Sequence, residues 1–70
     1  RLEIEYLNKA YNLELPKSEA YDTLGGLIVF NEEEIPKTGD EILIDQYSIE
    51  ILHATSTKIE KVILKKINQE

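Results

Sequence analysis

The sequence EILIDQYSIEILHA, residues 41–54, decides the fold class of this 70-residue chain. Apolar residues occupy every second position on both sides of the polar dipeptide Asp45-Gln46. A period of two is typical of strands that bury one face, and a polar dipeptide between two such runs can turn the chain. The stretch therefore predicts a β-hairpin. The second strand should carry on one face Tyr47, Ile49, Ile51 and His53.

The residues after this hairpin predict one more strand. Thr55-Ser56-Thr57 forms a polar turn region, and the segment 59–67 that follows places Val62 and Leu64 on one face. Successive strands joined by short turns pair in an antiparallel meander. We therefore expect a three-stranded antiparallel sheet in the C-terminal half.

Helical spacing replaces the period of two in the N-terminal half. In the segment 2–13, apolar residues recur at steps of four, which places them on one stripe of a helix. Asn12 can end this helix, and residues 13–16 then form an extended exit before a polar connection over 17–22. The residues expected on the stripe are Leu2, Tyr6, Leu7, Ala10 and Tyr11.

A second helix is expected to start near Asp22 and to run through Phe30. The short side chain of Asp22 can accept a hydrogen bond from the first free backbone N–H groups, which makes it the expected cap. Asn31–Asp40 is expected to be a loop because it holds the two helix breakers Pro36 and Gly39. Together these segments predict an α+β domain, residues 1–70, with two N-terminal helices packed on a three-stranded antiparallel meander.

Composition limits the classes of protein that this chain can be. It has 8 basic and 14 acidic side chains, a formal charge of −6, and no cysteine. The acidic balance argues against nucleic acid, and no apolar run approaches the roughly 18 residues that cross a bilayer. A chain without methionine is expected to be a piece of a longer protein.

Residues that could carry catalysis are few. His53 is the one histidine, and we expect it to be half-buried in a strand. A catalytic triad or a zinc site needs several convergent partners around such a residue, and neither pattern is present. The sequence therefore predicts that the chain is not an enzyme and binds no catalytic metal.

Glu32, Glu33 and Glu34 form the most suggestive polar cluster, close in sequence to Asp40-Glu41. Magnesium and calcium prefer carboxylate oxygens, so a weak cation site is conceivable here. Three adjacent glutamates in a loop more commonly point in different directions into solvent. The commoner arrangement is the one we expect.

Two adjacent glycines, Gly25 and Gly26, stand inside the second expected helix. Each costs about 1 kcal/mol in a helix relative to alanine, so a compensating reason is required. The pair lacks the spacing of phosphate-binding loops. Close packing against the sheet or the neighbouring helix is therefore the expected reason.

Two blocks of sequence resemble a known family. They are YDTLGGLI, residues 21–28, and IPKTGDEI, residues 35–42, and they lie at the separation found in the transporter-associated domain of CorC/HlyC proteins. The resemblance extends over nearly the whole chain. The positions that match its signature, which we interpret as structural, are Thr23, Leu24, Gly25, Gly26, Leu27, Ile35, Pro36 and Gly39.

The resemblance implies a place and a role. Members of the family form the C-terminal part of bacterial membrane proteins, at the cytoplasmic face of the inner membrane. Their parents are described as magnesium and cobalt efflux proteins or as haemolysins. The implied partners are a CBS-domain pair and the transmembrane region of the same chain, and a homodimer is a further one. The resemblance also implies a fold related to certain FAD-binding domains. Flavin adenine dinucleotide is therefore a candidate ligand by fold analogy alone, and no cofactor is expected.

Some positions depart from the family pattern. Glu34 precedes Ile35 where the family often has a basic or small residue, and Asp45-Gln46 stands where it commonly has glycine in the first hairpin turn. Turns without glycine favour longer loops. The opening strand of the family also has no counterpart before the first helix, which would expose a sheet edge for a partner to cover.

Two hypotheses about function follow. The leading one is a non-enzymatic regulatory or interaction domain that modulates divalent-cation transport by its parent. The alternative is a sensor that binds a divalent cation or an adenine or flavin nucleotide.

Overall fold

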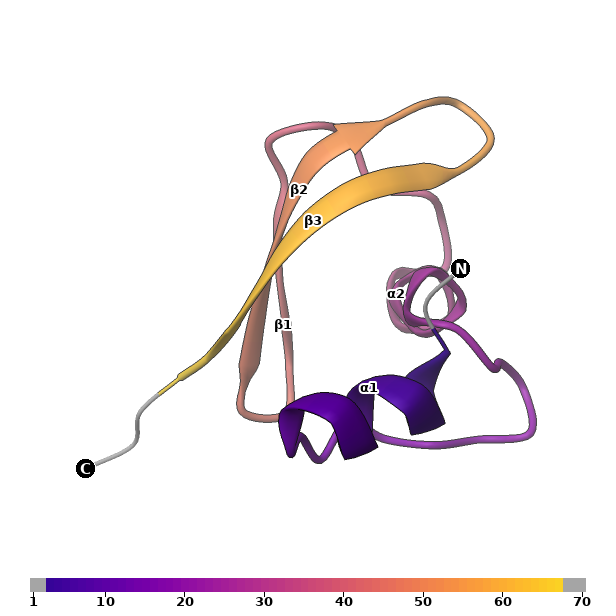
Figure 1. Cartoon of the computed structure of the whole chain (residues 1–70). Helices are drawn as coiled ribbons and strands as arrows, with labels where there is room; N and C mark the ends of the chain where they lie inside the picture. Colours follow the sequence, from indigo (N-terminus) through magenta and orange to yellow (C-terminus); the bar gives the residue numbers. More distant parts are fainter. Residues whose placement is uncertain (1–2, 68–70) are drawn as a thin grey trace. The chain divides into compact units, whose positions relative to one another are not determined.

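The computed structural model describes residues 3–67 and divides the chain into two units. The first unit, Arg1–Glu33, contains both helices, and the second, Glu34–Glu70, contains the sheet. Two helices followed by three antiparallel strands confirm the α+β class (Figure 1). The packing of the helices on the sheet stays a prediction.

Helix α1, Ile4–Tyr11, ends where the sequence predicted. Asn12 takes the left-handed conformation with φ 56°, and its backbone N–H donates to the carbonyl of Asn8. Asparagine tolerates this region better than most residues, which explains why the helix ends there.

The predicted apolar stripe of α1 is wrong in most of its members. The buried residues of the helix are Ile4 and Leu7, whereas Tyr6 is 57 % exposed and Tyr11 is 64 % exposed. Tyr6 lies two positions after Ile4, which is nearly the opposite side of a helix with 3.6 residues per turn. Ala10 is also exposed, and Leu2 lies outside the described residues. The steps of four therefore marked the wrong face.

Helix α2, Leu24–Glu32, starts two residues after the expected start near Asp22 and ends two residues after Phe30. Its N-cap is Thr23 and not Asp22: the Thr23 hydroxyl accepts a hydrogen bond from the N–H of Gly26 at 3.1 Å. Thr23 has the extended backbone that an N-cap needs, so its own oxygen faces the first turn. The helix also includes Asn31 and Glu32, which were predicted to lie in the loop.

The connection between the helices is held by side-chain contacts to backbone. The amide of Asn8 donates to the carbonyl of Leu15 at 3.1 Å and accepts from its N–H at 2.9 Å. The Tyr21 hydroxyl donates to the carbonyl of Pro16 at 3.1 Å. Because Leu15 is buried, the Asn8 amide satisfies backbone groups that would otherwise lack partners.

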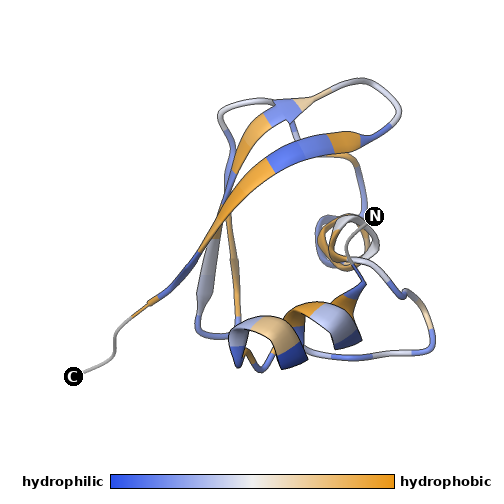
Figure 2. Ribbon diagram, viewed as in Figure 1, coloured by the Kyte–Doolittle hydropathy of each residue, from blue (hydrophilic) through white to orange (hydrophobic). Residues whose placement is uncertain are grey.

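The sheet follows the predicted meander. Its strands are β1 (Glu41–Ile44), β2 (Tyr47–Ala54) and β3 (Ile59–Lys66), in the order β1-β2-β3 with both pairs antiparallel. The alternation of apolar and polar residues along the strands is visible in Figure 2 as changes between orange and blue. The buried residues of the strands are Ile42, Ile44, Tyr47, Ile49 and Ile51.

The two hairpins have no glycine in their turns, and they differ in the length of their loops. The first uses a two-residue loop, since Ile44 pairs with Tyr47 directly across Asp45-Gln46, so the expected longer loop is wrong here. Asp45 takes φ 52°, a region that aspartate tolerates better than most residues. The second hairpin has the longer loop: Ala54 pairs with Ile59, and the hydroxyl of Thr55 accepts from the N–H of Lys58 at 3.2 Å.

An irregular register near the end of β2 changes the position of His53. Ile51 pairs with Val62 and His53 pairs with Lys61, so Leu52 is an extra residue in the strand. An extra residue interrupts strict alternation. The predicted half-buried histidine is therefore wrong: the His53 side chain is 59 % exposed and no longer shares a face with Ile51.

Candidate functional site

The first signature block forms the start of α2. Leu24 and Leu27 are buried, and Thr23 caps the helix as described. A Cβ atom at Gly26 would meet the Cβ of Tyr21 at 3.0 Å and the hydroxyl of Thr23 at 3.3 Å. Glycine at this position therefore permits a close approach of the chain that precedes the helix.

Gly25 differs from its neighbour. A Cβ atom at Gly25 would meet no described atom within 4 Å outside its own helical turn. Close packing therefore explains Gly26 and does not explain Gly25. The close neighbour of Gly26 is the segment immediately before α2, rather than the sheet or α1 as the sequence had suggested.

The second signature block forms the turn that leads into β1. The carboxylate of Asp40 accepts from the N–H of Lys37 at 2.9 Å, and Gly39 takes φ 98°. The N–H of Gly39 then donates to the carbonyl of Ile51 at 2.8 Å, and the N–H of Ile51 donates to the carbonyl of Asp40 at 2.8 Å. Pro36 is buried and Ile35 is half-buried beside this turn. The geometry of the block is architectural, since its polar groups bind backbone.

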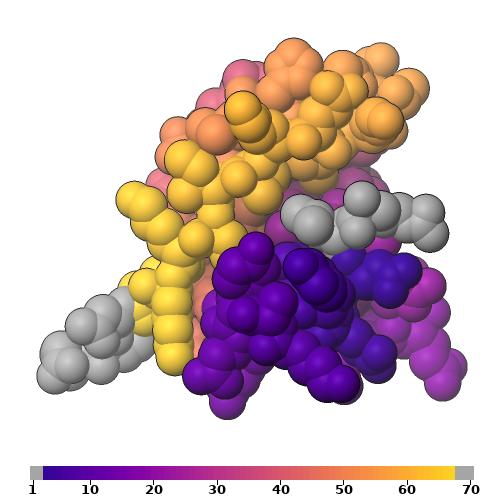
Figure 3. Space-filling view, in the orientation of Figure 1, coloured from indigo at the N-terminus to yellow at the C-terminus, as the bar shows by residue number. Residues whose placement is uncertain are grey.

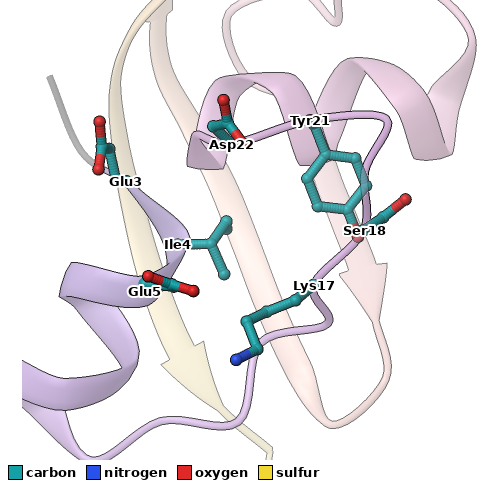
Figure 4. A pocket seen from close by; sticks show the side chains of 7 residues that line it. All are labelled: Glu3, Ile4, Glu5, Lys17, Ser18, Tyr21 and Asp22. Carbon is teal, nitrogen blue, oxygen red and sulfur yellow. The ribbon is translucent and has the colours of Figure 1, made fainter.

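A cavity of about 330 Å³ lies in the first unit, at the start of α1 (Figure 4). Its two sides are joined by a backbone hydrogen bond from the N–H of Ile4 to the carbonyl of Asp22, 2.8 Å long. The sequence pattern contained no signal for this cavity, because its lining comes from two separated segments. The lining residues are Glu3, Ile4, Glu5, Lys17, Ser18, Tyr21 and Asp22.

The charges around the cavity are mostly negative. The lining includes three carboxylates and one ammonium group, that of Lys17. In Figure 4 the carboxylates of Glu3, Glu5 and Asp22 point in different directions. Across residues 3–67, no group of three or more His, Cys, Asp or Glu side chains is arranged to hold a metal ion. The cavity can attract a cation without offering it a coordination shell.

The predicted acidic cluster does not form one structural element. Glu32 is the last residue of α2, and its carboxylate accepts from the Asn31 amide at 2.8 Å. Glu33 ends the helix with φ 64°. Glu34 belongs to the second unit, and all three side chains are exposed.

His53 has an acidic neighbour in the sheet. Its Nε2 atom lies 3.6 Å from Oε1 of Glu60, and both side chains are largely exposed, at 59 % and 41 %. Exposed pairs of this kind contribute about 0–1 kcal/mol to stability. The pair is consistent with a surface contact between β2 and β3.

A family model decides what kind of domain this is. The model described as the transporter associated domain, CorC_HlyC, matches residues 1–68. The chain belongs to the CorC/HlyC transporter-associated domain family. The resemblance carried by the two sequence blocks is confirmed.

Curated relatives of this transporter-associated domain are much longer proteins. The inner membrane protein YfjD of Escherichia coli is 37 % identical over 59 residues, which cover 84 % of this chain and 14 % of that protein. The polyamine export protein of E. coli is 28 % identical over 57 residues, which cover 81 % of this chain and 13 % of that protein. The chain thus spans about one seventh of these relatives.

Solved structures share the fold. A conserved protein of unknown function from Haemophilus influenzae has a TM-score of 0.84 and 35 % identity, and the match covers 94 % of this chain and 80 % of that one. A CorC_HlyC domain from Haemophilus ducreyi has a TM-score of 0.73 and 27 % identity, with 99 % and 82 % covered. The relation to FAD-binding domains stays a prediction.

The neighbour from Neisseria meningitidis is described as the associated region of a Mg²⁺ and Co²⁺ transporter (CorC). It has a TM-score of 0.84 and 26 % identity, and the match covers 94 % of this chain and 80 % of that one.

Within residues 3–67, neither helix has the length and apolar character needed to cross a membrane.

Proposed function

We propose that this transporter-associated domain is a non-enzymatic regulatory domain of a membrane protein that transports cations. The observation that carries the proposal is the family match over residues 1–68. The names of the relatives support it, because one is an inner membrane protein and another a polyamine export protein. The domain then works at the cytoplasmic face of the inner membrane.

Regulation requires the domain to distinguish two states of its parent. A domain that binds both states equally shifts nothing, so its contacts must differ between them. We propose that these contacts are made with a CBS-domain pair and the transmembrane region of the same chain. Exposed aromatic side chains in the first unit can make such contacts: Tyr6, Tyr11 and Phe30 are 57 %, 64 % and 59 % exposed.

The transported cation is a separate part of the proposal. Magnesium and cobalt are the leading candidates, supported by the name of the neisserial neighbour. Organic polycations are the second candidate, supported by the name of the polyamine export proteins. Both classes are cations, and the regulatory mechanism is the same for each.

Transport by the parent protein tests the proposal. We would measure efflux of Mg²⁺, Co²⁺ and spermidine in membrane vesicles, with the intact parent, with this domain deleted, and with Gly26→Val inside it. We expect the deletion and Gly26→Val to change the rate of efflux of one cation several-fold at equal levels of parent in the membrane. Unchanged efflux of all three cations after deletion would overturn the regulatory role.

A sensor is the second candidate, favoured by the cavity at the start of α1. Its lining carries three carboxylates and one ammonium group, a surface that attracts small cations. Direct titration of the domain, described in the Discussion, separates this candidate from the first.

A further inference from the structure

We draw no further inference here: the strongest candidate, the surface patch on β3 that holds the exposed side chains of Lys61, Ile63 and Lys65 and belongs to the strand drawn in yellow in Figure 3, carries nothing, because no feature of residues 3–67 shows what covers it.

Discussion

At the scale of single residues, the two neighbouring glycines have different roles. Gly26 lies against Tyr21, whereas the space at Gly25 is open. Glycine is required only where a side chain would collide with a neighbour or where φ is positive. Gly25 meets neither condition. The pair therefore offers an internal comparison at almost the same place in α2.

Alanine at the two glycines should shift stability in opposite directions. We expect Gly25→Ala to stabilise the fold by about 0.5–1 kcal/mol, since alanine favours the helix. We expect Gly26→Ala to destabilise it and Gly26→Val to lower the melting temperature by several degrees, because Tyr21 must move. Thermal unfolding by circular dichroism measures all three. Equal stabilisation by alanine at both positions would refute the close approach.

The side chain of Asn8 joins α1 to the connection between the helices through two hydrogen bonds to the backbone of Leu15. We expect Asn8→Ala to cost roughly 1–3 kcal/mol, because it removes a donor and an acceptor from the buried Leu15 backbone. Urea unfolding measures this cost. Lys9→Ala, at the exposed neighbouring position, is the control and should change stability little.

At the scale of elements, the start of α2 depends on one hydroxyl. Thr23→Ala should cost about 0.5–2 kcal/mol, because the N–H of Gly26 loses its acceptor. Thr23→Ser should restore most of that stability, and Asp22→Ala should cost less than Thr23→Ala. Chemical denaturation of the three variants ranks them. A larger loss of stability in Asp22→Ala than in Thr23→Ala would show that Asp22 is the N-cap, as the sequence had suggested.

In the first hairpin, the positive φ angle at position 45 determines which residue is most stable there. Asp45 has φ 52°, which glycine adopts without steric cost. We expect Asp45→Gly to preserve or raise the melting temperature and Asp45→Val to lower it, because a β-branched residue is strained at positive φ. The amides of Ile44 and Tyr47, which are partners across the strands on either side of the turn, should stay protected from exchange in Asp45→Gly.

At the scale of the whole molecule, the question is whether the domain binds a ligand or a protein. The regulatory proposal predicts no saturable, local change in backbone amide shifts when the labelled chain is titrated with Mg²⁺, ATP or FAD at millimolar concentration. The triple variant Glu32→Gln, Glu33→Gln, Glu34→Gln is the control for the acidic cluster. Saturable shifts around Glu32–Glu41 that vanish in this variant would favour the sensor, and shifts at Glu3–Glu5 would point to the cavity.

The sequence by itself determined the elements and their order. Alternation at period two placed all three strands, and the positions of Asp45-Gln46 and Thr55-Ser56-Thr57 placed both turns. Asn12 marked the end of α1. These features are local, since a residue and its near neighbours in the chain carry the whole signal. The family signature was readable for the same reason.

The tertiary structure decided which residues face inward and which groups pair. Ile4 is buried and Tyr6 is exposed. The extra residue Leu52 in β2 exposes His53, and the Asn8 side chain hydrogen-bonds the backbone of Leu15. All three features depend on contacts between segments that are separated in the chain. The cavity at the start of α1 arises in the same way. Periodicity cannot reveal them, because it reports the spacing of residues along one element, while hydrogen bonds across strands and loops set register and exposure.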